Sequence, residues 1–561
     1  MIARLAAKSV NLSYSLGLPV PLRLQIMVER WLWNHPSQIK VFLNLVTPAA
    51  LWKMSENKLV AVVRYFIRET PALKKRVEGC FPNGLRTFQD FKDHMPVLDK
   101  ASYVKTNTLV DLCRGGRIPR AGSLYKSAGT SGQPTIWADS VEEQLAFDKT
   151  VGFIGHTLLD MFGHDYFIVN CWVMGSWLTG GNFASSARFY GAIINIGTLL
   201  EEATETIRSL GPSRRMLLAG YPPFIFSLLQ RLEAVGIKFS DYHFDVVVGG
   251  EGFVEEWRDS LIRKLGNKSV IFSVYGSSDK GLGEGIESHL AYAVRTLFYV
   301  ASLSFIDQKK AHEVWRLRSG EENLPFKTEA SARAFLSRLL GEDLLHRLPM
   351  VFQFDPSFYY NENRPTDGNP GARREFASTV LVPLLTIPRV RYNIHDEGFV
   401  VTYDEVRQAA AEAGLDWNRL NLRHDKYFDL HLPFLFIFGR TDGTVSIDGA
   451  NIFPQDVERT VREDAALSEA VYGHQLFVTD AFNLGVSLEL RAGTANTPDL
   501  LERARAQLDN RLATYSSGFG ELRRDHLPSA VLTVETHPYN TGPFANRRVK
   551  TAGVRAPAKP Q

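Results

Sequence analysis

The sequence predicts an α/β protein that has a large multi-layer N-terminal domain, with mostly parallel sheets flanked by helices, and a small α+β C-terminal domain. From about residue 124 onward, short apolar runs alternate with helical stretches, as in YFIVNCWVM, TETIRSLG, MLLAGYP and DVVVGGEG. Strands followed by helices at this pitch are typical of a parallel sheet. A chain of 561 residues also exceeds what one hydrophobic core usually organises, so a second domain is expected.

The first segment, residues 1–105, has a helical pattern. In WKMSENKLVAVVRYFIRETPALKKRVEG the apolar residues recur at three- and four-residue spacing. The first 28 residues contain Arg4, Lys8 and Arg23 and no acid, and their apolar positions are interrupted too often to form a signal-peptide core. We expect a helical extension that leads into the large domain, with a membrane-surface or targeting helix as the alternative. No apolar run reaches the roughly 18 to 20 residues that a transmembrane helix needs.

The second segment, residues 106–438, carries the alternation of strands and helices. Within it, residues 307–348 form a charged stretch rich in Ala and Leu, which we interpret as a helical insertion on the surface. The third segment, residues 439–561, begins with a strand, a turn at Arg440 to Gly443, a second strand, a Gly/Asn turn and a helix. Further short strands and a helix over 498–513 complete a compact α+β module.

The composition excludes several classes of function. With 45% apolar and 22% charged residues the chain is typical of a soluble globular protein, and a formal net charge of +3 gives no field that favours nucleic acid as a partner. Three cysteines, Cys80, Cys113 and Cys171, lie far apart and indicate neither a disulfide framework nor a zinc site. A reducing, cytoplasmic location is expected.

A hydroxyl- and glycine-rich loop is the most specific local signal. Residues 125–135 read YKSAGTSGQPT, in which glycines let backbone N–H groups approach phosphate oxygens and hydroxyl groups add further donors. The loop is not GxxxxGK[ST], so a standard P-loop is not predicted. Two further glycine-rich loops, VVVGGEG and SVYGSSD, follow strand-like runs, where ligands bind in parallel sheets.

The order of five segments is more informative than any one of them. SAGTSGQPT, VVVGGEGF, VYGSSD, VRYNIHDEG and FGRTDGTVSIDGANIFPQDVE follow one another along the chain. In this order they resemble the motifs of the adenylate-forming (ANL) enzyme superfamily, and in detail those of its phenylacetate–CoA ligase-like branch. The resemblance spans roughly residues 69–550 and implies that the C-terminal domain acts as a mobile lid.

The resemblance implies which residues bind ATP and AMP. The hydroxyl-rich loop would embrace the β- and γ-phosphates, the strand-end glycines and Tyr275 would enclose the adenine, and Asp396 would accept both ribose hydroxyls, a role suited to an ionised carboxylate. The set of nucleotide-binding residues is Ser127, Gly129, Thr130, Ser131, Gly132, Gly249, Gly250, Glu251, Tyr275, Gly276, Ser277, Asp396 and Arg440.

It also implies the remaining roles. Ser278 would donate to the α-phosphate, and Asp442 would be the hinge of the lid. Asp279 occupies the position of the family's usual glutamate and would help to hold Mg²⁺, through water because its side chain is shorter. The acid would lie between two aromatic-rich segments, against Trp172, Trp177, Phe183, Tyr221 and Phe224.

One position departs from the family pattern. Where the family has a catalytic lysine, the C-terminal segment NTGPFANRRVK carries Ala545, and the loss of such a charge-stabilising donor commonly slows a reaction about a hundred- to a thousand-fold. Three explanations remain open: Ala545 replaces a lysine by engineering, Arg547 on the same face substitutes for it imperfectly, or the protein binds nucleotide without completing the reaction. Another departure follows Asp279, where relatives tend to carry a Cys/His-containing stretch.

The leading hypothesis is therefore an ATP-dependent, Mg²⁺-requiring ligase. It would form an acyl-adenylate from a small-molecule carboxylic acid, one with an aromatic body, release pyrophosphate and transfer the acyl group to coenzyme A. The alternatives are a ligase with another acceptor (an amine, a carrier protein or a small inorganic nucleophile) and a nucleotide-binding pseudoenzyme. The sequence leaves the oligomeric state open, with a homodimer possible.

Overall fold

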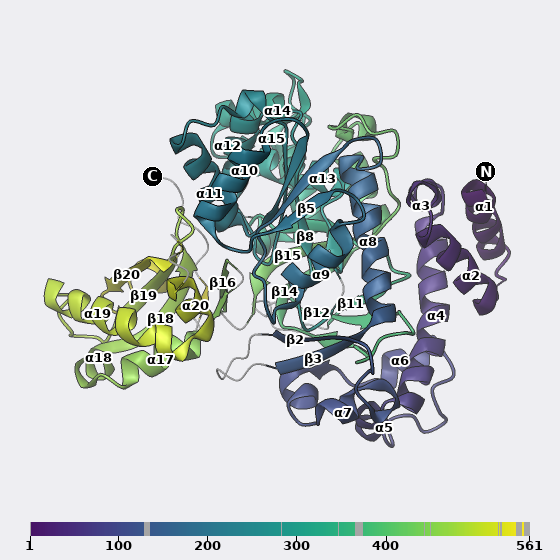
Figure 1. Cartoon of the computed structure of the whole chain (residues 1–561), viewed down its shortest axis with the longest axis horizontal. Coiled ribbons are helices and arrows are strands. Elements are labelled where there is room, and N and C mark those ends of the chain that lie inside the picture. Colours follow the sequence, from purple (N-terminus) through teal and green to yellow (C-terminus); the bar gives the residue numbers. More distant parts are fainter. Residues whose placement is uncertain are drawn as a thin grey trace.

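A computed structural model describes residues 2–18, 20–127, 135–281, 283–345, 347–364, 374–441, 444–448, 450–524, 527, 530–545 and 553–554. Figure 1 shows a large body that contains the N-terminal helices and the central sheet, and a smaller C-terminal body beside it. This arrangement confirms the predicted α/β class with a large N-terminal and a small C-terminal domain.

The N-terminal segment is helical, as its periodicity predicts. Thr47 caps the longest of these helices through the backbone N–H of Ala50, and Thr87 begins another with a capping box. The elements are α1 (Ile2–Ser15), α2 (Leu22–Trp33), α3 (Pro36–Leu43), α4 (Pro48–Glu69), α5 (Pro71–Arg76) and α6 (Phe88–His94), followed by β1 (Leu98–Asp99), η1 (Lys100–Val104), α7 (Leu109–Leu112) and η2 (Arg114–Gly116). Among the described helices, none combines the length and the apolar character needed to cross a membrane.

The central sheet is mixed. Its strands lie in the order β14 (Asp396–Val401), β15 (Phe434–Arg440), β10 (Met350–Gln353), β9 (Gly285–Ile286), β8 (Ile271–Tyr275), β7 (Phe244–Gly249), β6 (Arg215–Gly220), β4 (Tyr166–Asn170) and β5 (Ala192–Asn195). From β5 to β8 all pairings are parallel, and from β8 to β14 all are antiparallel. The predicted parallel sheet is therefore the half of this sheet that runs from β5 to β8.

Two smaller sheets complete the large domain. One has the order β1, β13 (Tyr392–Asn393), β12 (Phe376–Val380) and β11 (Tyr359–Asn363), and the other is the hairpin of β2 (Gly122–Ser127) and β3 (Thr135–Ser140). The helices between the strands are α8 (Val141–Leu159), α9 (Leu178–Ala187), α10 (Leu200–Leu210), α11 (Pro222–Ala234), α12 (Glu255–Leu265), α13 (His289–Ser304), α14 (Gln308–Ser319), α15 (Glu329–Leu340) and α16 (Tyr403–Glu412), with the short turns η3 (Phe239–Asp241), η4 (Glu342–Leu344) and η5 (Trp417–Leu420).

Strand β15 separates two hydrophobic cores. Phe434 and Phe436 pack with α13, α14 and α15, whereas Leu435 and Ile437 belong to the core on the other face. Alternate side chains of a strand point to opposite faces, so the sheet is covered on both sides.

The stretch 307–348 is helical, as predicted, but it is more than a surface insertion. It forms α14 and α15, whose Trp315 and Phe335 are fully buried against the nearly all-apolar helix α13. Both helices therefore bury one apolar face and expose charged residues on the other. Charged residues on the outer faces obscured the apolar stripe, whose partner, α13, was not predicted.

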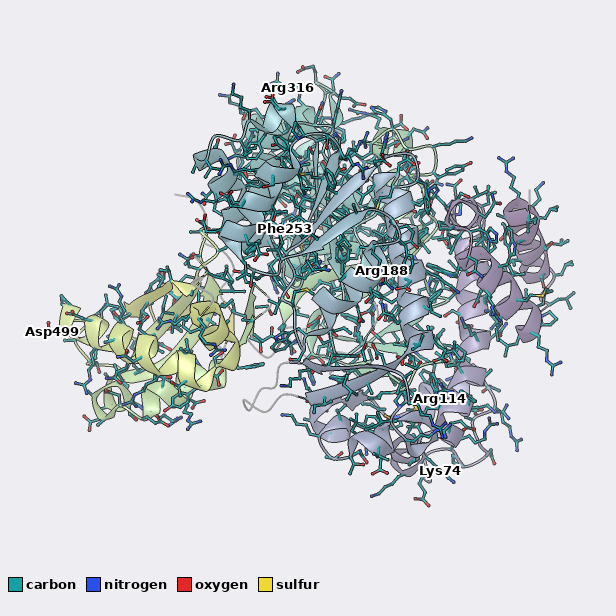
Figure 2. All side chains as sticks on the ribbon, viewed as in Figure 1. Lys74, Arg114, Arg188, Phe253, Arg316 and Asp499 are labelled. Carbon is teal, nitrogen blue, oxygen red and sulfur yellow. The ribbon has the colours of Figure 1, made fainter. Side chains whose placement is uncertain are left out.

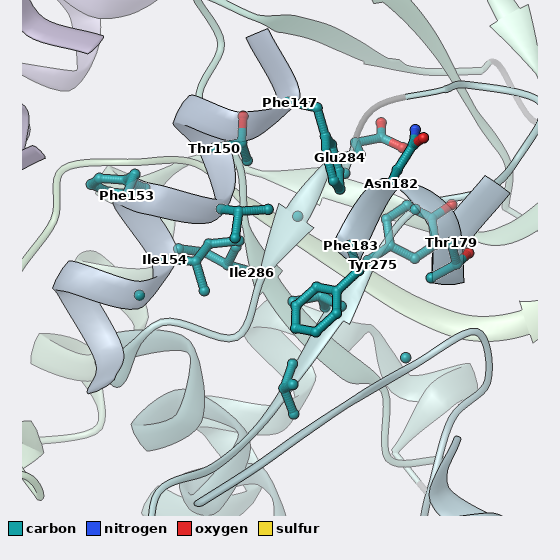
Figure 3. Close-up of a pocket in the computed structure, with 18 of the residues that line it drawn as sticks. Phe147, Thr150, Phe153, Ile154, Thr179, Asn182, Phe183, Tyr275, Glu284 and Ile286 are labelled. Atoms are coloured by element: carbon teal, nitrogen blue, oxygen red, sulfur yellow. The ribbon is translucent and has the colours of Figure 1, made fainter. Parts of the chain in front are cut away.

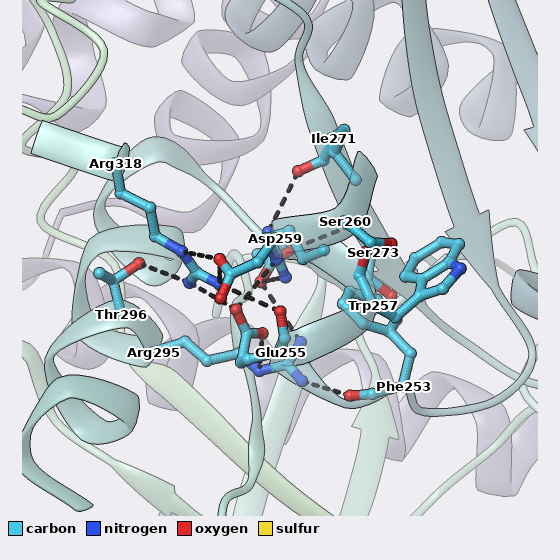
Figure 4. Close-up of polar contacts among 12 residues, drawn as sticks. Phe253, Glu255, Trp257, Asp259, Ser260, Ile271, Ser273, Arg295, Thr296 and Arg318 are labelled. Carbon is cyan, nitrogen blue, oxygen red and sulfur yellow. Dashed lines mark hydrogen bonds and ion pairs between the residues drawn. The ribbon is translucent and has the colours of Figure 1, made fainter. Parts of the chain in front are cut away.

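A buried network of charges joins α12, α13 and α14 (Figure 4). Glu255 lies within 3.2 Å of the guanidinium of Arg258, 2.8 Å of that of Arg295 and 2.5 Å of that of Arg318. Arg258 also reaches Glu287 at 2.5 Å, and a carboxylate oxygen of Glu287 accepts the backbone N–H of Ser273 in β8 at 3.0 Å. The network thus anchors the strand that leads into the SVYGSSD loop.

The C-terminal domain has its own sheet in the order β20 (Leu532–His537), β19 (Leu484–Leu490), β18 (Val471–Val478) and β21 (Gly553–Val554), beside the hairpin β16 (Val445–Ile447) and β17 (Ala450–Ile452). Its helices are α17 (Pro454–Arg462), α18 (Ala465–Ala470), α19 (Pro498–Tyr515) and α20 (Ser517–Arg524), with the short η7 (Gly542–Phe544). The chain leaves the central sheet at Arg440, the last residue of β15.

Candidate functional site

A largely apolar cavity lies at the carboxyl ends of the parallel strands (Figure 3). It encloses about 190 Å³, far more than a buried water needs, so it is large enough for an organic ligand. Its floor comes from the strand ends, and one wall comes from α8 through Phe147, Thr150, Val151 and Ile154. These α8 residues follow the i, i+3, i+4, i+7 spacing of one helix face.

Three of the five aromatic residues predicted for the acid pocket line this cavity: Trp172, Phe183 and Tyr221. Trp172 and Tyr221 pack edge to face, with ring centroids 5.0 Å apart. The other two lie outside this lining. Trp177 precedes α9 as its half-buried N-cap residue, and Phe224 is buried within α11.

Tyr275, which lines the cavity, contacts Asp396, although 121 positions separate them. The Tyr275 hydroxyl donates to Asp396 Oδ2 at 2.5 Å, and the Arg440 guanidinium donates to Asp396 Oδ1 at 3.4 Å. Asp396 and Arg440 are register partners on β14 and β15. Burial raises the pKa of Asp396, and the Arg440 charge and the Tyr275 hydrogen bond oppose that rise.

Close packing alone explains why Gly249 and Gly250, at the end of β7, are glycines, whether or not a nucleotide binds there. A Cβ on Gly249 would lie 2.8 Å from the carbonyl oxygen of Val274, and a Cβ on Gly250, whose φ is +85°, would lie 2.9 Å from the Tyr221 ring. Both glycines line the cavity. Close packing against Val274 and Tyr221 is therefore sufficient to require glycine at these positions.

Glu251, predicted to lie near the adenine, joins the two domains. One of its carboxylate oxygens accepts the backbone N–H of Asp448 at 2.9 Å, and Asp448 lies in the turn between β16 and β17. Burial, reinforced by the Asp448 charge, raises the pKa of Glu251 well above its ordinary value.

A second polar group gathers around Lys100, which sequence reasoning missed. The Lys100 ammonium donates to Ser127 Oγ at 2.8 Å and to Asp279 Oδ1 at 3.2 Å, and Trp137 Nε1 donates to the same Ser127 oxygen at 2.8 Å. Burial lowers the pKa of Lys100, partly opposed by the Asp279 charge. Its segment, LDKASYV, belongs to a stretch that resembles the entry region of the phenylacetate–CoA ligase-like branch, but the resemblance assigned no role to Lys100, and only the fold reveals that Lys100 faces Ser127.

Arg389 holds the Asp279 backbone in place. Its Nε donates to the Asp279 carbonyl at 3.0 Å, and one of its terminal nitrogens donates to the Tyr125 hydroxyl at 3.1 Å. The side chain is buried, and the pKa of Tyr125 is raised well above its ordinary value, chiefly by burial. The arginine thereby ties the SVYGSSD loop to the strand that leads into YKSAGTSGQPT.

Two hydroxyl groups in the cavity wall have no hydrogen-bond partner in the described part of the chain. They are Ser277 Oγ, which was predicted as a nucleotide-binding residue, and Tyr359 OH, which was not. A buried donor without a partner is costly, so a polar ligand atom in the cavity would relieve both. Gly276 also lines the cavity, and Ser278 lies in the following turn.

Several predicted residues lie outside the described residues: Gly129, Thr130, Ser131, Gly132, Asp442 and Arg547. Ala545 is described. It is exposed at the end of η7, where its backbone N–H donates to the Gly542 carbonyl at 3.2 Å. It is not among the residues that line the cavity.

The described residues contain no group of three or more His, Cys, Asp or Glu side chains arranged to hold a metal ion. Asp279, predicted to help hold Mg²⁺, forms an ion pair with Lys100 at 3.2 Å. The three cysteines are free thiols, and Cys113 and Cys171 are buried.

No family model and no curated protein sequence matches the chain. Among solved structures, the crystal structure of 2-hydroxyisobutyryl-CoA ligase in complex with 2-HIB-AMP and CoA, in the thioesterification state, matches with a TM-score of 0.55. The sequence identity is 15%, and the match covers 90% of this chain and 88% of that chain. An open conformation of the same ligase matches with a TM-score of 0.47 at 15% identity (91% and 92% covered). The GH3.15 acyl acid amido synthetase matches with a TM-score of 0.41 at 12% identity (87% and 86% covered).

The first of these matches establishes the fold, which extends over almost the whole of both chains. The phenylacetate–CoA ligase-like branch stays a prediction. The chain has the fold of the adenylate-forming (ANL) enzymes, as the order of its motifs predicted.

Proposed function

We propose that this chain is an ATP-dependent ligase that joins a carboxylic acid to AMP as an acyl-adenylate, releases pyrophosphate and transfers the acyl group to coenzyme A. The observation that carries the proposal is that the separate motif segments contact one another, and that two of them, VVVGGEG and SVYGSSD, also line the apolar cavity. Tyr275 contacts Asp396, Asp396 contacts Arg440, and Ser127 and Asp279 are joined by Lys100. These segments are the ones that the motif order assigns to the nucleotide.

The polar groups suit the parts of ATP in turn. Asp396 would accept the ribose hydroxyls, with Arg440 favouring its ionised form. Ser127, which directly precedes residues 128–134 in the sequence, and Lys100, which contacts it, would face the phosphates, where a lysine acts as a compact positive charge. Asp279 would help to hold Mg²⁺, since that ion is usually bound by one or two carboxylates together with substrate phosphates.

The acid would occupy the cavity. Its aromatic and aliphatic walls favour an acid whose body is apolar or aromatic. Ser277 Oγ and Tyr359 OH, which have no hydrogen-bond partner among the described residues, would form hydrogen bonds with the polar atoms of the acid. The residues of the chain would contribute mainly by positioning the reactants and by stabilising negative charge on phosphate oxygens. Because Ala545 lacks a charge, we expect slow adenylation.

The small domain would act as a lid that reorients between the two half-reactions. Asp442, the predicted hinge, follows the last residue of β15 closely. The Glu251–Asp448 contact holds the β16–β17 hairpin against the strand-end glycines, so a lid movement would have to break it. The use of coenzyme A, rather than an amine or a carrier protein, is proposed on the resemblance of the motifs.

Exchange of labelled pyrophosphate into ATP, measured over a panel of aromatic and aliphatic acids, tests the proposal. We expect weak acid-dependent exchange by the chain itself and an increase of about a hundred- to a thousand-fold for Ala545→Lys. Ala495→Lys is the matched control, because it adds the same charge at another exposed alanine of the small domain.

Each outcome favours one of the three explanations for the alanine at position 545. Strong exchange without the added lysine would favour Arg547 as its substitute, and exchange that appears only with the lysine would favour a lost lysine. Nucleotide binding without exchange in either protein would reject the ligase and leave a nucleotide-binding protein. Thioester formation with coenzyme A, compared with amine acceptors in the same assay, then identifies the acceptor.

A further inference from the structure

The surface of α1 and α2 exposes an unusual number of large apolar side chains. Leu5, Leu12, Leu16, Leu18 and Met27 are between 57% and 63% exposed. Ile2, Tyr14, Leu24 and Ile26 are exposed as well. Nine large apolar side chains are thus exposed within the described part of residues 2–27, two of them (Leu16 and Leu18) in the connection between α1 and α2. Contiguous exposed apolar surface marks an interaction site more often than ordinary solvated surface.

Helix α2 places large apolar side chains on its outward face, although Leu32 and Trp33 are buried near its C-terminal end. Its inward face buries Gln25 and Glu29, which are joined at 2.8 Å, and Glu29 forms a buried ion pair with Lys58 of α4 at 2.6 Å. Its outward face carries Leu24, Ile26 and Met27. A helix in water normally buries its apolar stripe and exposes its polar one, so the outer face of α2 is built for an apolar medium.

The charge of this surface is of one sign. Arg4, Lys8, Arg23 and Arg30 are exposed, and Glu29, the one acid among the first 30 residues, is buried and paired. A second copy of the chain would set these cations against one another in a two-fold symmetric contact. Exposed apolar residues interspersed with cations are instead the pattern of helices that lie in the interface of an anionic bilayer.

We propose that α1 and α2 bind the surface of an anionic phospholipid membrane, with the helices lying in the interface. With 14 residues, α1 is only ~21 Å long and is too short to span the ~30 Å hydrocarbon core. α1 packs on α3 and α4, and α2 packs on α3, α4 and α8. Because this end of the molecule lies opposite the C-terminal domain (Figure 1), membrane contact would leave the small domain free.

Flotation of the full chain with lipid vesicles tests the proposal. We expect binding to vesicles of phosphatidylcholine mixed with phosphatidylglycerol, weaker binding at high salt, and little binding to phosphatidylcholine alone. Replacing three cations together (Arg4→Gln, Lys8→Gln and Arg23→Gln) should weaken partition on the order of a hundred-fold, given the usual contribution of each basic residue near an anionic surface.

The matched control removes the same charge elsewhere. Lys74, Lys75 and Arg76 of α5 are exposed and lie at the other end of the helical segment, where Figure 2 labels Lys74. Their replacement by Gln should leave vesicle binding unchanged. A second variant, Leu24→Ser with Met27→Ser, removes apolar surface without changing charge, and it should also reduce partition.

The proposal is overturned if the unmodified chain does not float with the anionic vesicles, or if the α5 variant loses as much binding as the α1–α2 charge variant. Light scattering on the same proteins without lipid tests the alternative that a second copy of the chain, rather than a membrane, covers the surface of α1 and α2. If the unmodified chain self-associates without binding vesicles, and the variant Leu24→Ser with Met27→Ser does not self-associate, the surface is a dimer contact. Neither result depends on whether the chain is a ligase.

Discussion

Lys100 provides a positive charge in the predicted phosphate region. The family pattern instead places a lysine in the C-terminal segment, where this chain has Ala545. Its ammonium lies between Ser127 Oγ and Asp279 Oδ1 and is only one-fifth exposed, whereas Ala545 contributes no charge. Hydrogen bonds that involve a charged group contribute about 1.5 to 3 kcal/mol each. The side chain is therefore a strong candidate for holding the ATP phosphates.

Replacing Lys100 with Met should lower the affinity for ATP by about ten- to a hundred-fold, because one charged hydrogen bond to a phosphate is lost. Isothermal titration calorimetry with ATP measures the change. Lys74→Met, on the exposed helix α5, is the control and should bind ATP as the unmodified chain does. Equal affinities for both variants would remove Lys100 from the nucleotide site.

Single residues show where sequence reasoning succeeds and where it ends. The motif order predicted that Tyr275, Asp396 and Arg440 belong together, and they contact one another. It gave no indication of Lys100, because the partners of a lysine depend on which segments the fold brings alongside it. The same limit explains Phe224, whose aromatic character is equally consistent with the core of α11, where it lies.

At the scale of elements, the buried network links α12, α13 and α14 because the carboxylate of Glu255 pairs with arginines on all three helices. Burial raises the pKa of Glu255, but the guanidinium groups of Arg258, Arg295 and Arg318 outweigh it and hold that pKa at about 2. The folded state therefore favours the ionised form. This contribution to stability is fully present above the ordinary pKa of 4.5 and is lost as the pH falls toward 2.

Glu255→Gln should lower the free energy of unfolding at neutral pH by about 3 to 5 kcal/mol, since it leaves buried arginines without their shared partner. Denaturation by urea, followed at neutral pH and at pH values below 4.5, measures both the loss and its acid dependence, which should be smaller in the variant. Glu256→Gln is the neighbouring control. Its surface ion pair with Lys310 should contribute less than about 1 kcal/mol.

Helix periodicity predicted most of the N-terminal helices, but it could not predict what they contact. The apolar stripe of a helix identifies the buried side chains, whereas their partners are set by the packing of the whole chain. Trp33, the last residue of α2, lines the cavity together with Phe153 of α8 and Phe358. The N-terminal segment is therefore part of the candidate site as well as a support for it.

At the scale of the whole molecule, the cavity extends from the strand ends near Tyr275 to the helical segment at Trp33. The Trp33 ring packs edge to face against Phe153 and Phe358, with centroids 5.5 Å and 4.4 Å away. If the acid lies along this cavity, Trp33 limits the length of its apolar body. A smaller side chain at this position would therefore lengthen the pocket without altering the strand-end residues.

Trp33→Leu should shift the preference of the ligase toward longer acids by about 10- to 200-fold in the ratio of kcat/KM values, the range associated with one methylene group in an apolar pocket. Pyrophosphate exchange in the Ala545→Lys background, with a series of acids of increasing length, measures that ratio. Trp31→Leu is the control, because Trp31 stacks on His35 and is not part of the cavity lining. An unchanged length profile for Trp33→Leu, in a protein that still melts cooperatively, would place the acid elsewhere and confine the N-terminal helices to a structural or membrane-facing role.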